Sequence, residues 1–369
     1  MKKDGHIAVD LFSGAGGLSL GLKRAGFVIA GAIENDPVAV RTYRHNLGDH
    51  VIEAPIESVS GAGVRRRFNI EQGGCALLAG GPPCQGFSVQ RNGPRHDARN
   101  ALVLEYLRLV KQIRPRFFLL ENVPGLTFSA ARPLLSHFID TAVKLGYAIH
   151  LRKLDAVYYG VPQFRLRTIM VGELTNGQPP IFQFPLQRYD KSSWKTVRDA
   201  IGDLDSPPLD GSEHGAIKNH YRESRLSKVN QERLKHIPPG GAREDLPVHL
   251  QLPCHTNNPT HRHLDVYGRL IWDKPAVTIT ARFDSFTRGR FAHPEEHRSL
   301  TLREGARIQT FPDEFVFFGN REECARQIGN AVPPKLAEII GREIVFALNR
   351  GRRADLETNG ESESSSLIA

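Results

Sequence analysis

Residues 6–17 read HIAVDLFSGAGG, an apolar run followed at once by a glycine-rich turn. The run His6–Leu11 is short and apolar, as is typical of a buried strand. Residues Leu18–Ala25, behind the turn, have helical spacing. A strand, a glycine turn and a helix in direct succession begin a βαβ unit, so this stretch predicts a parallel sheet.

The same alternation of strand and helix continues through the first 175 residues. Further strands are predicted at Phe27–Ile33, Cys75–Ala79, Phe117–Leu120 and Thr168–Val171, with helices at Ala101–Ile113 and Ala131–Leu145. We therefore expect an α/β fold with a doubly wound, mostly parallel sheet and helices on both faces. Sheets of this kind bind ligands beyond the carboxyl ends of their strands, which is where the polar motifs of this chain fall.

The glycine turn has the composition of a cofactor site. A dinucleotide fingerprint would need a third glycine at position 19, where Ser19 stands, so a nicotinamide cofactor fits poorly. Glu34 ends the second strand, 20 residues after Gly14, and a carboxylate there can accept hydrogen bonds from ribose hydroxyls. This combination favours an adenosine cofactor without a pyrophosphate, namely S-adenosylmethionine. The alternative is a structural turn beside a solvated glutamate.

Cys84 lies in the sequence GPPCQGFS (81–88), directly after an apolar strand. Two prolines stiffen this turn and present the cysteine at the strand end. A thiolate is a strong nucleophile, and helix-end dipoles or nearby cations lower its pKa. The alternative for a single cysteine is a buried structural role. The surrounding pattern favours the nucleophile.

Two further motifs bring an acid and two arginines to the same edge of the sheet. Glu121 closes the strand 117–120, and a carboxyl group between apolar strands can serve as an acid. Gln163, Arg165 and Arg167 alternate along the chain, so in a strand they share one face. We expect all three to point into one cleft. The alternative is a solvated edge strand.

The composition is that of an ordinary globular protein with a basic balance. Apolar residues make up 40% and charged residues 24% of the chain, and the net charge is +9. A basic chain favours a polyanionic partner without proving one.

The N-terminus has no apolar run of a signal peptide, and no stretch reaches the length of a membrane span. Four scattered cysteines without a CxxC pair indicate a reducing cytoplasm rather than a disulfide framework.

After residue 175 the pattern changes to a region rich in Pro, His, Asn and Arg with weak periodicity. We expect one domain of residues 1–175 plus 327–349 and a second, loop-rich domain of residues 176–326. Helical spacing returns at Leu300–Gln309 and Ala337–Leu348. The polar, Ser/Glu-rich tail 350–369 is predicted to be disordered.

Taken together, these segments resemble the DNA (cytosine-5) methyltransferase family, of the bacterial restriction-modification type. The resemblance covers roughly residues 7–175 and 265–348. It implies that residues 1–175 plus 327–349 form the catalytic and cofactor-binding domain and that residues 176–326 form the target-recognition domain. The matching motifs, in chain order, are the glycine turn, GPPCQGFS (81–88), ENV (121–123), QFRLR (163–167), RSLTLREGARIQTFPD (298–313) and QIGNAVPP (327–334).

The resemblance implies a mechanism for the residues described above. Cys84 would add to C6 of a cytosine, and Glu121 would bind the N3 and amino edge and supply a proton. Arg165 would contact the cytosine carbonyl oxygen, with Arg167 in support and Gln163 completing the motif. The target base must flip out of the duplex. The loop that closes over it would be residues 88–100, and its expected DNA contacts are Ser88, Gln90, Arg91, Arg95 and Arg99.

The resemblance also implies the residues that bind S-adenosylmethionine. They are Phe12, Gly14, Gly16, Glu34, Asn35, Ile56, Leu102, Asn330 and Val332. The chain departs from the family in the stretch 53–57, where Pro55 takes the place of the acid that meets the adenine amino group. The sequence leaves open which group makes that contact.

Basic residues of the second domain, residues 176–326, are candidates for contacts with DNA phosphates and bases. They are Arg222, Arg225, Lys228, Arg233, Arg243, Arg262 and Arg269. The alternative is a solvated basic surface. Cys254, His255, His261 and His263 contain one cysteine at irregular spacing, so no metal site is expected.

These observations predict a DNA (cytosine-5-)-methyltransferase that acts on duplex DNA. The compact length favours a prokaryotic modification enzyme, with a cognate restriction endonuclease as a possible partner. We expect a cytoplasmic monomer that associates with the nucleoid when bound to DNA and has no membrane contact. The alternatives are a tRNA cytosine-5 methyltransferase on the same scaffold and a non-catalytic DNA-binding relative.

Overall fold

A seven-stranded sheet forms the centre of the computed structural model, which describes residues 5–83, 101–128, 131–175, 177–223, 226–252 and 265–365. The strand order is β3-β2-β1-β4-β5-β7-β6. The strands are β1 His6–Leu11, β2 Phe27–Glu34, β3 Val51–Glu53, β4 Leu77–Gly80, β5 Phe117–Asn122, β6 Tyr147–Asp155 and β7 Leu166–Leu174. Strands β1 to β5 pair in parallel, whereas β7 is antiparallel to both β5 and β6.

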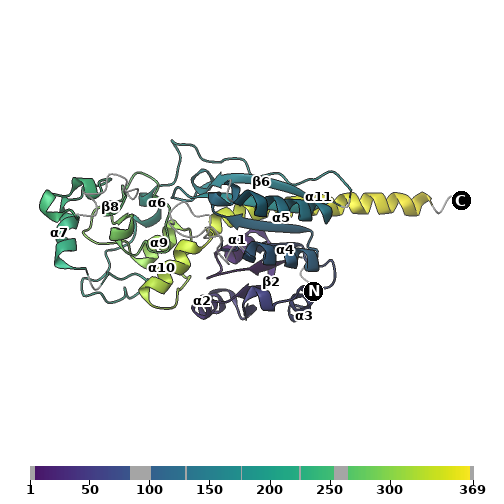
Figure 1. The fold of residues 1–369 in the computed structure, drawn as a ribbon, viewed down its shortest axis with the longest axis horizontal. Helices are drawn as coiled ribbons and strands as arrows, with labels where there is room; N and C mark the ends of the chain where they lie inside the picture. Colours follow the sequence, from purple (N-terminus) through teal and green to yellow (C-terminus); the bar gives the residue numbers. More distant parts are fainter. Residues whose placement is uncertain are drawn as a thin grey trace.

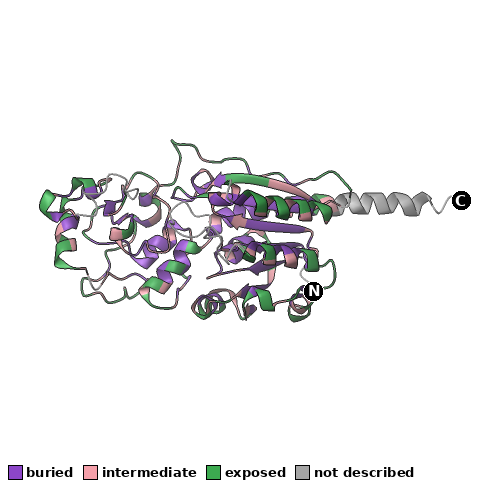
Figure 2. Ribbon diagram, in the orientation of Figure 1, coloured by how far each residue is buried: buried purple, intermediate pink, exposed green. Residues whose placement is uncertain are grey.

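Helices cover both faces of this sheet (Figure 1). They are α1 Gly17–Ala25, α2 Pro37–Leu47, α3 Gly61–Arg67, α4 Ala101–Ile113, α5 Arg132–Lys144 and α11 Pro334–Ser365. Along β5, Phe117 and Leu119 pack in the same core as α1 and α11, while Phe118 and Leu120 pack in the core of α3, α4 and α5. This two-sided burial explains why the inner strands read as continuous apolar runs (Figure 2). The predicted doubly wound, mostly parallel fold is confirmed.

The chain order reverses between β1 and β4, because β2 and β3 lie on one side of β1 and β4 and β5 on the other. A crevice forms beyond the carboxyl ends of strands at such a switch point. The glycine turn follows β1, and Gly81 to Pro83 follow β4. The topology therefore brings the two motifs to the same crevice.

Short elements and long connections make up residues 177–333. They are the helices α6 Val197–Ile201, α7 Lys228–His236, α9 Leu302–Ile308 and α10 Arg321–Asn330, and the strands β8 Gly268–Arg269 and β9 Arg290–Ala292. Single 3-10 turns occur throughout the chain, at Ile56–Ser58, Pro124–Thr127, Ala156–Tyr159, Arg243–Asp245, Val248–Leu250 and Phe286–Arg288. Figure 1 shows this region beside the carboxyl edge of the sheet. Its larger core includes Ala15 of the glycine turn, so the two parts share packing.

The structure contains a strand, β6, that the sequence did not predict, and its last helix is longer than predicted. Strand β6, with exposed Arg152 and Lys153, was not predicted because an edge strand faces water and lacks an apolar run. The polar stretch from residue 350, for which a disordered tail is expected, continues α11 as far as Ser365 (Figure 1). Once a helix is nucleated by packing, each added residue gains a backbone hydrogen bond, which favours this extension.

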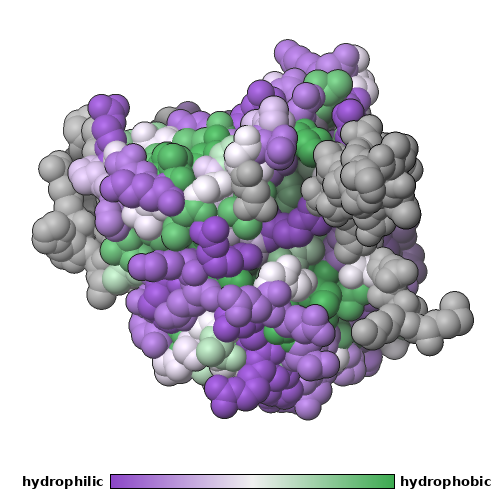
Figure 3. All heavy atoms as spheres, turned by 90° about the vertical axis from the view of Figure 1, so that its right-hand side faces the viewer, coloured by the Kyte–Doolittle hydropathy of each residue, from purple (hydrophilic) through white to green (hydrophobic). Residues whose placement is uncertain are grey.

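The surface at the α11 end mixes hydrophilic and hydrophobic residues, as Figure 3 shows. Within the described part of the chain, no helix is both long and apolar enough to cross a membrane.

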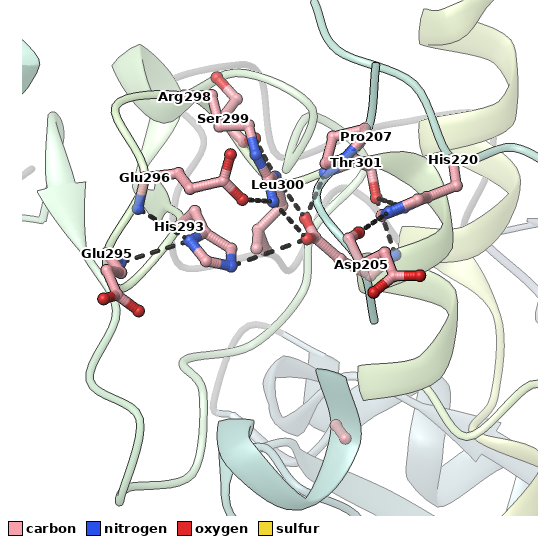
Figure 4. Close-up of polar contacts among 12 residues, drawn as sticks. Asp205, Pro207, His220, His293, Glu295, Glu296, Arg298, Ser299, Leu300 and Thr301 are labelled. Atoms are coloured by element: carbon pink, nitrogen blue, oxygen red, sulfur yellow. Dashed lines mark hydrogen bonds and ion pairs between the residues drawn. The ribbon is translucent and has the colours of Figure 1, made fainter. Parts of the chain in front are cut away.

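A buried ionic network fixes the start of α9 (Figure 4). Glu304 lies in the first turn of the helix and forms a two-fold contact with Arg298, at 2.7 and 2.8 Å. It also accepts the N–H of Thr301 at 2.7 Å. Burial by itself raises the pKa of Glu304, but the charge and hydrogen bonds of Arg298 outweigh it and lower the pKa from 4.5 to about 2. The network ties the loop before α9 to the helix.

This network makes stability depend on pH in a defined direction. A carboxyl group with a lowered pKa stabilises the folded state above its unfolded pKa, and this contribution is lost as the pH falls from about 4.5 to about 2. We expect Glu304→Gln to lower the free energy of unfolding at pH 7 by about 3 kcal/mol, because it leaves Arg298 buried without its main partner. Denaturant unfolding at several pH values measures both effects.

A matched control is Glu322→Gln. Glu322 is 65% exposed in its ion pair with Arg282, so the expected change is below about 1 kcal/mol. The wild type should lose more stability than Glu304→Gln between pH 5 and pH 3. An equal loss in both proteins contradicts the assigned role of Glu304.

Candidate active site and cofactor cavity

Two cavities meet at the carboxyl edge of the sheet. The first, here called the polar cavity, is lined by residues of the glycine turn, by Gly81 and Glu121, and by residues 326–332. The second, here called the apolar cavity, is lined among others by Ile33, Ile56 and Leu102. Four residues line both of them: Phe12, Glu34, Asn35 and Pro83. The two cavities therefore form one continuous site. Their names refer to the charged side chains of Glu121 and Arg326 in the first and to the apolar side chains of Ile33, Ile56 and Leu102 in the second.

The glycine turn shapes the polar cavity through its backbone. Gly14 and Gly16 have φ angles of 54° and 98°, in the left-handed region that favours glycine. Gly16 lines neither cavity but caps α1, and a Cβ on it would meet Leu47 and Tyr43. A Cβ on Gly17 would lie 2.5 Å from the carbonyl oxygen of Val332. The turn therefore depends on glycine for both its conformation and its contact with the segment after α10.

Glu34 is held in place by three backbone N–H groups. Gly14 donates to Oε2 at 2.7 Å, while Asn35 and Asp36 donate to Oε1 at 2.8 and 2.9 Å. The carboxylate is thus fixed where the two cavities join. Carboxylate oxygens have further lone pairs, so Glu34 can still accept hydrogen bonds from hydroxyl groups of a ligand.

The structure places most of the expected cofactor residues around these cavities. Asn330 and Val332 line the polar cavity, and Ile56 and Leu102 line the apolar one. Near Pro55, Glu57 also lines the apolar cavity, so an acid stands two residues after the family position. Sequence reasoning did not consider Glu57, because it lies outside the matching position.

Glu121, at the end of β5, forms an ion pair with Arg167 of β7. The Oε1 to Nε distance is 3.0 Å, and both side chains are nearly buried. The next residue, Asn122, donates to the carbonyl oxygen of Pro82 at 2.9 Å and accepts the N–H of Val123. This fixes the proline turn against β5. Sequence analysis missed the role of Asn122, because a hydrogen bond to a residue 40 positions away leaves no local pattern.

Cys84 lies outside the described residues, as do Ser88, Gln90, Arg91, Arg95 and Arg99. The preceding residue, Pro83, lines both cavities. The chain therefore reaches the junction of the two cavities one residue before the predicted nucleophile.

Arg165 and Gln163 do not point into the cleft as expected. The Arg165 guanidinium is buried and donates to the carbonyl oxygens of Ile279, Gly329 and Ala331, each at 2.9 Å. Gln163 is fully buried and hydrogen-bonded to the backbone of Ile308 and Ile279. The predicted strand begins only at Leu166, so the alternation does not extend to these residues. Of the three side chains, Arg167 is the one that reaches Glu121.

Asp10, near the end of β1, supports the glycine turn without lining either cavity. It is buried, and Ser19 of α1 donates a hydrogen bond to it at 2.7 Å. Burial raises the pKa of Asp10 to about 7, although the hydrogen bonds from Ser19 oppose this shift. Ser19, at the position where a dinucleotide fingerprint has glycine, thus ties α1 to β1.

Several basic residues predicted to contact DNA have other roles. Arg269 is buried and donates to four carbonyl groups, and Arg233 donates to the carbonyl of Leu250. Arg243 is buried, and Arg222 pairs with Glu296. The prediction is therefore wrong for Arg233 and Arg269, which hold the fold of this region together. Lys228 is exposed, and Arg225 and Arg262 lie outside the described residues.

No cluster of three or more metal-ligating side chains occurs in the described ranges. Cys254, His255, His261 and His263 lie outside them.

Comparison with known proteins places this geometry in a family. The fold is that of the S-adenosylmethionine-dependent methyltransferases: a DNA modification methyltransferase encoded within a prophage (E. coli) superposes with a TM-score of 0.72 at 27% identity, over 93% of this chain and 99% of that one. A methyltransferase of Entamoeba histolytica, at 16% identity and a TM-score of 0.64, shares the fold.

Residues 7–345 match the C-5 cytosine-specific DNA methylase family. Type II methylase M.HgiDII of Herpetosiphon aurantiacus is 33% identical over 91% of this chain and 94% of that protein. Type II methyltransferase M1.HphI of Haemophilus parahaemolyticus is 36% identical over 92% and 87%. The chain belongs to the C-5 cytosine-specific DNA methylase family and is a DNA (cytosine-5-)-methyltransferase of the restriction-modification type, as the sequence predicted.

The hydrogen bonds of Arg165 lead to a test that separates a structural from a chemical role. We expect Arg165→Met to lower the free energy of unfolding by about 3 kcal/mol or more, because three buried carbonyl groups lose their donor. Arg165→Lys should recover part of this loss, since one ammonium cannot reach all three acceptors. Denaturant unfolding measures the difference.

Arg24→Ala serves as the control, because Arg24 is exposed at the end of α1 and a change within about 0.5 kcal/mol is expected there. If Arg165→Lys is as stable as the wild type yet inactive in methyl transfer, Arg165 acts on the substrate and the structural role is wrong.

Proposed function

We propose that this enzyme methylates C5 of a flipped-out cytosine in duplex DNA through a covalent bond between Cys84 and C6. The observation that carries the proposal is the Glu121–Arg167 ion pair, of which Glu121 lines the polar cavity together with Gly81. A Cβ on Gly81 would lie 3.2 Å from Oε2 of Glu121, so the acid and the turn that leads to Cys84 are in close contact.

The residues present fit S-adenosylmethionine as the cofactor. Ile33, Ile56 and Leu102 provide an apolar wall suited to an adenine ring, and Glu34 can accept from the ribose hydroxyls. Ser13 Oγ and Gln327 Oε1, both in residues that line the polar cavity, are buried without a hydrogen-bond partner among the described residues. Buried polar atoms without partners are rare and indicate a missing ligand or water. When bound, the cofactor supplies an electrophilic methyl group.

The chain's own residues would make the cytosine reactive. The Cys84 thiolate adds to C6, and the electron pair released in the ring moves toward C5 and N3. Glu121 gives a proton to N3 as charge builds there, and Arg167 holds the Glu121 side chain in position. Once C5 carries the methyl group, a base takes the C5 proton and the C6–S bond breaks, which releases the Cys84 thiolate. Glu121 takes back the proton from N3, and the ring is restored. Arg165 takes part by positioning the backbone of Gly329 and Ala331 rather than by touching the base.

Duplex DNA is the proposed substrate, and the base must leave the stack to reach Cys84. Ser88, Gln90, Arg91, Arg95 and Arg99 are the proposed DNA contacts in the segment after Cys84. The two curated relatives named above are both described as type II enzymes, which supports a role in protecting host DNA from a cognate restriction endonuclease. We also propose that the enzyme is a monomer and acts on DNA in the cytoplasm.

The covalent step has a direct test. Wild-type protein, incubated with S-adenosylmethionine and mixed-sequence duplex DNA containing 5-fluorocytosine, should form a denaturation-resistant complex, because fluorine at C5 blocks the release of Cys84. Cys84→Ser should form none and should lose methyl transfer by more than about 1,000-fold, because a serine hydroxyl is not ionised at neutral pH. Gel mobility and transfer of a labelled methyl group provide the two measurements.

Cys75→Ser is the matched control, because Cys75 is a buried cysteine outside both cavities. A covalent complex that persists in Cys84→Ser would refute Cys84 as the nucleophile. Methyl transfer to tRNA but not to duplex DNA would favour the tRNA enzyme. Bisulfite sequencing of DNA from cells that express the chain would identify the methylated cytosine.

A further inference from the structure

An ion pair joins two distant segments at the polar cavity. Asp36 is the N-cap of α2, and Arg326 lies in α10, 290 residues further along the chain. The distance from Nη2 of Arg326 to Oδ2 of Asp36 is 2.8 Å, and the side chains are 49% and 29% exposed. Both residues line the polar cavity. The pair therefore stands where a ligand in the cavity can meet both charges.

The other charged side chains that line the polar cavity, Glu34 and Glu121, are both negative. Glu34 is held by backbone N–H groups, and Glu121 is paired with Arg167. Among the described residues that line the cavity, Arg326 is the only positively charged side chain. A negatively charged group of a ligand in this cavity has Arg326 as its natural partner.

The shape of the site sets the direction in which a methyl donor must lie. Glu121 lines the polar cavity and not the apolar one, so the reactive methyl group belongs on the polar side. Glu34, which suits the ribose, lies where the cavities join. Adenine then falls in the apolar cavity, and the amino-acid end of the donor falls in the polar cavity. That end carries an α-carboxylate and an α-ammonium group.

We propose that the Asp36–Arg326 pair binds the amino-acid end of S-adenosylmethionine, an inference that rests on the proposed cofactor. The guanidinium of Arg326 binds the α-carboxylate, and the carboxylate of Asp36 binds the α-ammonium. Arginine has five N–H donors, so Arg326 can hold Asp36 and a ligand carboxylate together.

Two features support a ligand-binding role for this pair over a structural one. Exposed ion pairs add at most about 1 kcal/mol to stability, so this pair is a minor contributor to the fold. Gln327, which follows Arg326 in α10, lines the same cavity, and its buried Oε1 has no hydrogen-bond partner among the described residues. The cavity wall thus offers a further acceptor for an ammonium group.

The test compares three ligands that differ at the amino-acid end. S-adenosylmethionine and S-adenosylhomocysteine have this end, and 5′-methylthioadenosine lacks it. We expect Arg326→Gln in the full chain to weaken the first two about ten-fold, because one charge-assisted contact is lost, and to leave the third unchanged. Asp36→Asn should act in the same way while its side chain still caps α2 by accepting the N–H of Val38. Titration calorimetry measures each affinity.

The matched control is Arg44→Gln. Arg44 is 45% exposed in an ion pair with Asp49 at 2.8 Å, and it lines neither cavity, so all three affinities should stay as in the wild type. In turnover, Arg326→Gln should raise the KM for S-adenosylmethionine and leave kcat close to the wild-type value, as expected when binding is lost equally from ground and transition states.

The outcomes separate this inference from the function on which it rests. If Arg326→Gln weakens all three ligands equally, or none of them, the pair does not bind the amino-acid end and the inference is wrong while the cofactor stands. If the unaltered chain binds none of the three ligands, the proposed cofactor fails and the inference fails with it.

Discussion

The buried guanidinium of Arg165 holds together three parts of the chain that form the site. It enters from the segment before β7 and donates to Ile279 in the region between α6 and α10, and to Gly329 and Ala331 at the end of α10. An arginine can satisfy several carbonyl groups at once because its donors lie in a rigid plane. These bonds hold the backbone of Gly329 and Ala331 against the segment that leads into β7. The polar cavity has that backbone as one wall and the glycine turn as another.

Placing an arginine there has a clear physical consequence. A buried guanidinium must stay charged, so its surroundings have to supply acceptors, and backbone carbonyl groups do this without adding a second charge. Gln163 reinforces the same junction through the backbone of Ile308 and Ile279. The motif that carries both residues therefore builds the scaffold, and only Arg167 continues to the acid.

Ion pairs occur in two different environments in this structure, one in the core near α9 and one at the cavity. At the start of α9, the buried side chains of Glu304 and Arg298 form an ion pair in which each carboxylate oxygen of Glu304 accepts a hydrogen bond (Figure 4). At the cavity, Glu121 pairs with Arg167, and Asp36 pairs with Arg326 near the surface. The first arrangement stabilises the fold, because buried charges must be paired. The Asp36–Arg326 pair leaves both partners accessible, as a charged ligand requires, whereas the Glu121–Arg167 pair is nearly buried.

By itself, the sequence determined the central sheet and the family. Apolar strands that end in a glycine turn, in Gly81-Pro82-Pro83 and in Glu121 predict a parallel sheet with its site at the carboxyl edge, because local periodicity and strand ends are written in short stretches. The family motifs then pointed to Cys84, Glu34 and the cofactor residues.

Only the tertiary structure decided which side chains face the cavity and which face the core. The burial of Arg165, Gln163, Arg233 and Arg269, the tie from Asn122 to Pro82, and the pair of Asp36 with Arg326 all depend on residues far apart in the chain. Such contacts arise when separate elements pack, and a local pattern of residues cannot encode them.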